Sequence, residues 1–207
     1  MLYNQKIKDI LTLLTFYAVL YKSANYIFIG EATEIKPTFI DRFWSFNPHW
    51  IWIYLSSFIT VPLSYYFWFH KKREDFIFSF GLLTFTSFLI FVFYPTYIPR
   101  SHYLPDDMSP LYELIFQTLH TADGVTNCLP SLHVSTAFFV AWWSYDIKKI
   151  YFPYFLVYAI AVTISTMTVK QHYFYDGLGG FILSLLIVFG WRYFRKREGI
   201  NPSLEKV

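Results

Sequence analysis

Long apolar runs alternate with short polar segments along almost the whole chain. Six runs approach the roughly 20 residues that a helix needs to cross the hydrocarbon core of a bilayer. They cover residues 10–29, 51–69, 76–94, 131–146, 150–169 and 174–194. The first run is interrupted by Lys22, Ser23 and Asn25. The fourth is short and polar at its start, as expected of a helix whose first turn lines a cavity. The pattern predicts an all-α integral membrane bundle of six transmembrane helices.

The composition supports a membrane protein with a single domain over residues 1–207. Hydrophobic residues make up 55% of the chain, charged residues 15%, and the mean hydropathy is +0.35. A soluble domain normally has about a quarter of its residues charged. The net charge of +3 is too small to indicate nucleic-acid binding. The single cysteine, Cys128, excludes an intrachain disulfide, and a small buried residue is a better interpretation of it than a catalytic one.

Basic residues gather in alternate connections between the runs. If the N-terminus lies inside, the inner segments carry twelve of them and the outer segments four. The inner set is Lys6, Lys8, Lys71, Lys72, Arg73, Lys148, Lys149, Arg192, Arg195, Lys196, Arg197 and Lys206, and the outer set is Lys36, Arg42, Arg100 and Lys170. Because cytoplasmic loops are enriched in Lys and Arg, this bias predicts both termini in the cytoplasm. No small-x-small cleavage site follows the first run, so we expect an uncleaved first span.

The long connection over residues 95–130 should contain one short helix. Ser109 can cap it and Pro110 suits its first turn. The apolar residues expected on one face are Leu111, Leu114, Ile115 and Leu119. Such an amphipathic helix would lie at the membrane surface, where it either controls lipid access or only anchors the loop. His120 at its end fits an interfacial residue better than a ligand.

A histidine and a carboxylate introduce the sixth apolar run. His172 and Asp176 are four residues apart, a spacing that places both on one face of a helix within hydrogen-bonding reach. The carboxylate can hold one ring nitrogen as N–H and leave the other free as a nucleophile. A structural pair joining two spans is the alternative. Ionisable residues at a membrane edge are costly and usually functional, which favours the catalytic interpretation.

A second histidine opens the fourth run, in the segment Pro130-Ser131-Leu132-His133. The free N–H groups at a helix start can bind an anion, and the Ser131 hydroxyl adds a donor. His133 in that first turn can serve as a general acid. Arg100 follows the third run after Pro95 and Pro99, which make the stretch rigid, and its guanidinium group matches phosphate oxygens in geometry. Lys170 lies close to His172 in the sequence. Both cations could instead extend to lipid headgroups.

Together these residues resemble the motifs of the type 2 phosphatidic acid phosphatase superfamily of lipid phosphatases and phosphotransferases. The motifs of that family are K-x6-R-P, P-S-G-H and S-R-x5-H-x3-D. The second motif matches at Pro130, Ser131 and His133, with Leu132 in place of glycine. The resemblance covers most of the chain, since the six runs and the motif positions agree with the family's architecture.

The other two motifs match in part. The third motif matches at Ser165, His172 and Asp176. Thr166 stands where that motif has arginine. In the first motif only Arg100 matches, because Phe93 replaces the lysine and Ser101 replaces the proline. Two of the family's three phosphate-binding cations are therefore missing, and Lys170 can replace only one.

The resemblance implies a mechanism and a set of ligands. His172 would attack phosphorus to form a phosphohistidine, Asp176 would orient it, and His133 would protonate the leaving group. The expected phosphate ligands are Arg100, Ser131 and Lys170. The family needs no metal, and no cofactor is expected here, since the sequence offers no carboxylate cluster suited to a cation.

Substrate and reaction remain open between two alternatives. The leading prediction is hydrolysis of a phosphate ester or diphosphate on a lipid. The alternative is transfer of a phosphoryl head group to a lipid alcohol, because Leu132 and the run Gln171-His172-Tyr173 also resemble the inositol-phosphorylceramide synthase branch. The missing cations favour a phosphodiester or a diphosphate-linked substrate over a doubly charged monoester.

Two other classes fit the pattern less well. A transporter or scaffold would carry ionisable residues near the middle of several spans, whereas here they cluster at one edge. A haloperoxidase shares the motifs, but six spans argue against that soluble chemistry. The expected location is the inner or plasma membrane of a bacterium, with the active site on the outer face. Neither the lipid nor the oligomeric state is predicted.

Overall fold

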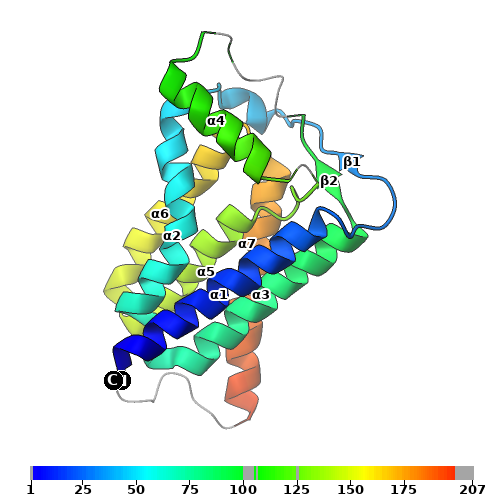
Figure 1. Ribbon diagram of the computed structural model, residues 1–207. Coiled ribbons are helices and arrows are strands. Elements are labelled where there is room, and N and C mark those ends of the chain that lie inside the picture. Colours follow the sequence, from blue (N-terminus) through cyan, green and yellow to red (C-terminus); the bar gives the residue numbers. More distant parts are fainter. Residues whose placement is uncertain (1, 100–104, 106, 125, 199–207) are drawn as a thin grey trace.

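The computed structural model describes residues 2–99, 105, 107–124 and 126–198, and within them it is mostly helical (Figure 1). Arg100 and Ser101 lie outside the described residues. The helices are α1 (Leu2–Ala24), α2 (Ile51–Phe67), α3 (Arg73–Phe93), α4 (Pro110–Ala122), α5 (Leu132–Ile147), α6 (Phe152–Thr168) and α7 (Phe174–Arg197). Short 3-10 turns occur at Ile40–Phe43, Pro48–Trp50, Phe69–Lys72 and Lys149–Tyr151. The predicted helical fold class is confirmed.

Three helical segments are long and apolar enough to cross a membrane. They are Phe69–Phe93, Lys149–Thr168 and Phe174–Arg197. The other three predicted spans also form helices, but α2 and α5 have only 17 and 16 residues. The protein is therefore a helical membrane protein, and the number of six spans stays a prediction.

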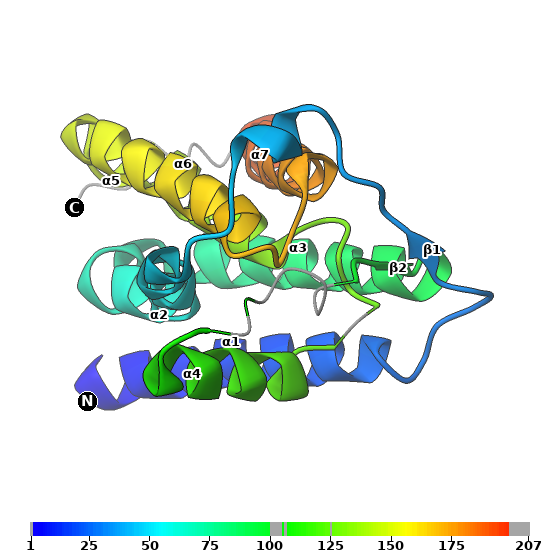
Figure 2. The same ribbon diagram turned by 90° about the horizontal axis from the view of Figure 1, so that it is seen from above.

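Helix α5 forms the centre of the bundle, and this position explains why its sequence shows no apolar stripe. Twelve of its 16 residues are buried, including every residue from Leu132 to Ala141. It packs against α6, α7 and α2. A helix covered on all sides by protein needs no polar face. Seen from above, α1 and α4 lie on one side of α2 and α3, and α6 and α7 lie on the other (Figure 2).

Glycine permits a close contact between α5 and α7. A Cβ atom built on Gly180 would lie 2.5 Å from the carbonyl oxygen of Ser131 and 3.1 Å from the backbone nitrogen of Ser135. Only a residue without a side chain fits there. The contact also places a hydrogen bond of 2.9 Å from the N–H of Ser131 to the carbonyl oxygen of Asp176. The starts of α5 and α7 are therefore held side by side.

A small parallel pair of strands, β1 (Thr33–Glu34) and β2 (Thr96–Tyr97), departs from the all-helical expectation. Thr33 pairs with Thr96, and Glu34 pairs with Tyr97. Thr96 also accepts a hydrogen bond on its hydroxyl from the N–H of Leu129, at 3.0 Å. The strand pair therefore anchors the segment that leads into α5. Cys128 in this segment is buried, as expected.

Helix α4 forms where the short helix was predicted, and part of its apolar surface packs on the bundle. Ser109 occupies the N-cap position without a capping hydrogen bond from its side chain. The residues that pack on the bundle are Tyr112, Ile115, Phe116 and Leu119. Leu111 and Leu114, which were expected to share a face with Ile115 and Leu119, are exposed. An exposed apolar stripe is what a helix at the membrane surface presents to lipid, and that position stays a prediction.

The two ends of the bundle are formed by different connections between the helices (Figure 1). The start of α1, the α2–α3 turn and the end of α7 lie at one end, where Arg73 makes a two-bond ion pair with Asp9, at 2.7 and 2.8 Å. Helix α4, the strand pair and the α6–α7 connection lie toward the other. The segments predicted to be inner and outer are therefore separated in space.

Candidate functional site

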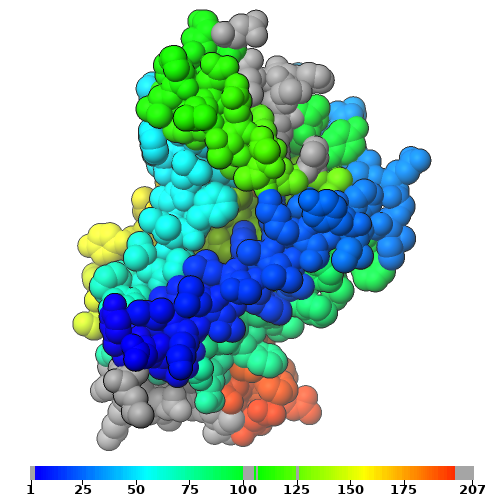
Figure 3. Space-filling view, viewed as in Figure 1, coloured from blue at the N-terminus to red at the C-terminus, as the bar shows by residue number. Residues whose placement is uncertain are grey.

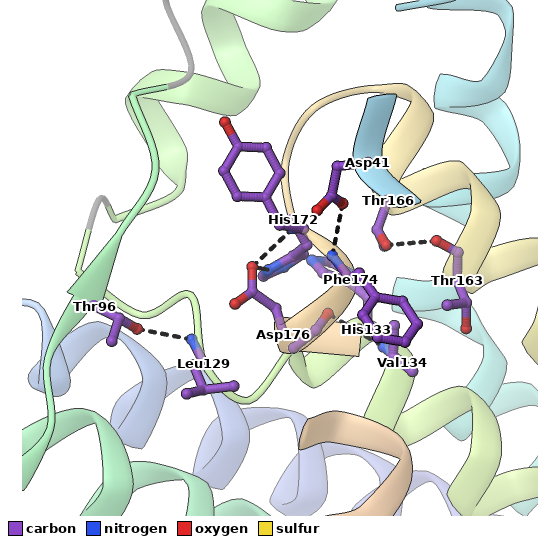
Figure 4. A network of polar contacts seen from close by, with 12 residues as sticks. Asp41, Thr96, Leu129, His133, Val134, Thr163, Thr166, His172, Phe174 and Asp176 are labelled. Carbon is purple, nitrogen blue, oxygen red and sulfur yellow. Dashed lines mark hydrogen bonds and ion pairs between the residues drawn. The ribbon is translucent and has the colours of Figure 1, made fainter. Parts of the chain in front are cut away.

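The predicted pair of His172 and Asp176 is formed, but not by stacking on a helix. Helix α7 begins at Phe174, so His172 precedes it. The Asp176 side chain turns back over the helix start, where its Oδ2 accepts the N–H of Tyr173 at 2.9 Å. The same oxygen lies 3.4 Å from Nδ1 of His172 (Figure 4). The pair thus meets through a helix-capping contact, in which the third residue of a helix bonds back to the cap.

A tight turn at the end of α6 directs His172 into the bundle. The carbonyl oxygen of Thr166 accepts the N–H groups of Gln171 and His172, at 3.0 and 3.2 Å. Lys170, in the turn between Thr166 and Gln171, has a positive φ of 58°, the left-handed conformation common where helices end. Thr166, which stands where the family has arginine, is itself buried, and its hydroxyl bonds to the carbonyl oxygen of Thr163. This position therefore supports the turn.

His133 lies in the first turn of α5, as predicted, and two residues of α2 hold its ring. Its Nδ1 is 2.7 Å from the hydroxyl of Ser57, and its Nε2 is 2.8 Å from the hydroxyl of Tyr54. The Ser57 hydroxyl donates its own hydrogen to the carbonyl oxygen of Tyr54, at 2.6 Å. It must therefore accept the Nδ1 hydrogen of His133, which leaves Nε2 as the nitrogen that gains and loses a proton.

Tyr54 and Ser57 were missed by sequence reasoning. Both lie in a run that reads as an ordinary span, and the available signal was a pair of hydroxyl side chains three residues apart on one helix face. That signal is weak, because Ser and Thr are common in membrane helices. Only the packing of α2 against α5 shows which polar residue they contact.

The two histidines lie close together and away from solvent. Their ring centroids are 5.8 Å apart, and their exposed fractions are 7% for His133 and 3% for His172. The ring of Phe58 stands edge-on to His133 at 4.8 Å. The bundle thus brings together all three predicted catalytic residues, from α5 and from the start of α7, within one buried cluster.

The three predicted phosphate ligands have different positions. Ser131 is buried, with its N–H bonded to Asp176 and its hydroxyl oxygen accepting the N–H of Val134 at 3.5 Å. The ammonium group of Lys170 donates to the carbonyl oxygens of Trp44 and Asp41. Arg100 lies outside the described residues. The structure therefore brings Ser131 into the cluster, whereas the charge of Lys170 is held by the chain segment before α2.

Asp41 in that segment is a buried carboxylate that the sequence did not single out. One of its oxygens accepts the N–H of Phe174 at the start of α7, and the other accepts the N–H and hydroxyl of Thr38, with all three distances 2.7–2.8 Å. Burial lowers the pKa of Lys170, and the nearby negative charge of Asp41 partly opposes this. Asp41 thus closes the loop over the helix start.

Polar atoms in the cluster retain bonding capacity. Among the described residues, Nδ1 of His172, Oδ1 of Asp176 and Oε1 of Gln171 are buried without a hydrogen-bond partner of normal geometry. Buried polar groups without partners are costly and often mark functional sites. In the same part of the chain, no three His, Cys, Asp or Glu side chains are grouped closely enough to hold a metal ion.

The fold and the site define a helical membrane protein with a buried cluster of two histidines and a carboxylate, suited to nucleophilic and acid–base chemistry. The chain belongs to the PAP2 superfamily, because the model of this superfamily matches residues 45–190, more than half of the chain. The predicted superfamily is thereby confirmed, and membership indicates phosphatase or phosphotransferase chemistry, often on lipids. The match includes all the residues of the cluster. None of the curated proteins and none of the solved structures compared with the chain matches it.

Proposed function

We propose that the protein is an integral membrane lipid phosphatase that hydrolyses a phosphate ester or diphosphate on a lipid through a phosphohistidine. The observation that carries this proposal is the burial of His172, Asp176 and His133 in one cluster, with the two rings 5.8 Å apart. Superfamily membership supports the same class of chemistry.

The geometry suggests a role for each nitrogen. Asp176 faces Nδ1 of His172, which keeps that nitrogen protonated and leaves Nε2 to attack phosphorus. As the N–P bond forms, the P–O bond to the lipid breaks, and His133 gives its Nε2 proton to the departing oxygen. Water then attacks phosphorus, the N–P bond breaks, and His133 takes a proton from the water. The proposed phosphate ligands are Arg100, Ser131 and Lys170, and Lys170 must first release the carbonyl oxygens of Asp41 and Trp44.

Trapping the intermediate tests this proposal. Purified protein is mixed with a lipid phosphate carrying radioactive phosphorus, quenched in alkali, in which phosphohistidine survives, and digested for mass spectrometry. We expect label on the peptide that contains His172, and none in His172→Ala or after acid treatment. Label on another residue, or hydrolysis by His172→Ala above about a hundredth of the wild-type rate, would refute the phosphohistidine, since acid–base help alone contributes about 10²–10⁴-fold.

Head-group transfer to a lipid alcohol is the second candidate, and the charges near the site favour it. Phe93 ends α3 where the family has lysine, and it is exposed. Lys170 is engaged by carbonyl oxygens. With few cations available, a singly charged phosphodiester is easier to bind than a monoester. An assay with a phosphodiester lipid and a long-chain alcohol separates the two reactions, because hydrolysis gives a free head group and transfer gives a new lipid.

The proposed topology has six spans, both termini in the cytoplasm and the site on the outer face of a bacterial inner or plasma membrane. The basic residues on the inner segments and the separation of the two ends of the bundle support it. In a Cys128→Ser background, Glu113→Cys on α4 should react with an impermeant thiol reagent outside intact cells. Glu74→Cys at the start of α3 should react only after permeabilisation, and the reverse pattern would invert the topology.

A further inference from the structure

A cavity of about 380 Å³ lies between α1 and α2 and reaches His133. Helix α3 contributes Phe80 and α5 contributes Thr136 to its wall, and the end of α4 borders it at Leu119 and Ala122. In the space-filling view, the surface is hollowed between the blue α1 and the cyan α2, below the green α4 (Figure 3). Its volume lies in the range of about 300–1,000 Å³ that is usual for small-molecule sites.

The chemistry of the cavity wall changes along its length. From Ile10 to Ala18, every residue of α1 that lines it is apolar or aromatic, and α2 adds Phe58, Val61 and Pro62. Polar groups gather toward the other end, where the Tyr21 hydroxyl bonds to Asp123 and the Lys22 ammonium bonds to the carbonyl oxygen of Ala122. Ser57 and His133 border the cavity from α2 and α5. Such a wall matches a molecule with a long apolar body and one polar end.

The length of the wall agrees with a lipid chain. The lining residues of α1 extend from Ile10 to Lys22, and twelve residues of an α-helix span about 18 Å. One leaflet occupies half of the roughly 30 Å hydrocarbon core of a bilayer, or about 15 Å. The cavity wall is therefore about as long as the hydrocarbon chain of a lipid in one leaflet.

We infer that this cavity holds one hydrocarbon chain of the substrate, and that it selects long-chain lipid phosphates. The inference rests on the proposed function, since the chain fills the apolar part only if the phosphate lies at the histidines. His133 belongs to both the cavity wall and the catalytic cluster, so one molecule can reach both. The substrate is then an amphiphile with one chain taken up between α1 and α2. Any further chain stays in the bilayer.

Chain selection is tested with Ala18→Phe, which fills the cavity, and Val19→Phe as its matched control. Val19 is the next residue of α1, lies outside the cavity wall and is 56% exposed. Both variants are assayed on butyl, octyl, dodecyl and hexadecyl phosphate in mixed micelles. Each buried methylene is worth about fourfold in kcat/KM, so displacing two should cost about tenfold or more.

In the wild type we expect kcat/KM to rise steadily with chain length. In Ala18→Phe the ratio of kcat/KM for hexadecyl to butyl phosphate should fall about tenfold or more, and in Val19→Phe it should stay within about twofold of wild type. An unchanged ratio in Ala18→Phe, or an equal fall in both variants, would overturn the inference.

A binding experiment separates this inference from the proposed function. His172→Ala protein is irradiated with hexadecyl phosphate that carries a photoactivatable diazirine at the chain end. We expect crosslinks to α1 and α2 at the cavity wall, and their loss when Ala18→Phe is added. If these crosslinks form but the wild-type protein hydrolyses no lipid phosphate, the proposed hydrolysis is refuted and the chain site is kept. Normal hydrolysis with crosslinks only elsewhere would refute the chain site alone.

Discussion

A side chain at Gly180 should inactivate the protein by separating the two helices that carry the histidines. The Cβ of Gly180→Ala would lie 2.5 Å from the carbonyl oxygen of Ser131, whereas ordinary contact begins at 3.4 Å. Helix α7 must therefore move by about 0.9 Å relative to α5, the difference between these two distances. The nearest atom, the carbonyl oxygen of Ser131, belongs to the backbone, so no side-chain rotation can relieve this clash.

The expected loss is larger for activity than for stability. Overpacking of this kind costs about 1–3 kcal/mol, and alanine regains about 1 kcal/mol of helix propensity over glycine. The net destabilisation should therefore be about 2 kcal/mol or less, and the protein should still fold. A displacement of about 1 Å in a catalytic arrangement can cost about 10²-fold in rate, and we expect a loss of that size in kcat.

Gly190 in the same helix provides the matched control, because a Cβ there would meet no atom within 4 Å. Gly190→Ala should retain wild-type activity and equal or slightly higher thermal stability. The assay is phosphate release from a lipid phosphate in micelles, with thermal unfolding followed by intrinsic fluorescence. If Gly180→Ala behaved like Gly190→Ala in both measurements, the close helix contact would not position the site as argued.

Three further predictions concern the cluster. Ser57→Ala removes the acceptor for Nδ1 of His133, so kcat should fall about tenfold or more, with KM little changed; a change in KM alone would contradict a role in catalysis. Asp176→Asn should keep weak activity, because the His172 imidazole remains while its orientation is lost; full activity would exclude the orienting role. Because His172 must be neutral to attack and His133 protonated to assist, the rate should pass through a maximum as the pH is varied. EDTA should not inhibit the reaction, whereas vanadate should. A rate that still rises at about pH 10 would contradict this mechanism, and so would an activity that is lost in EDTA and restored by Mg²⁺.

The sequence by itself determined the helical class, the positions of the helices and the identity of three clustered residues. Apolar runs of membrane length can satisfy their backbone groups only as helices, so this part of the fold is local information. His133, His172 and Asp176 could be chosen because polar residues at the ends of apolar runs are costly, and because their spacing matches known motifs. These arguments need no knowledge of which helices touch.

Only the tertiary structure decided how the site is assembled. The contact of His172 with Asp176 depends on where α7 begins, and helix boundaries are poorly set by local pattern. The hydrogen bonds of Tyr54 and Ser57 to His133 depend on α2 lying against α5. The starts of α5 and α7 lie side by side only because Gly180 has no side chain. Such contacts join residues far apart in the chain, and their geometry follows from packing between helices rather than from the periodicity within one.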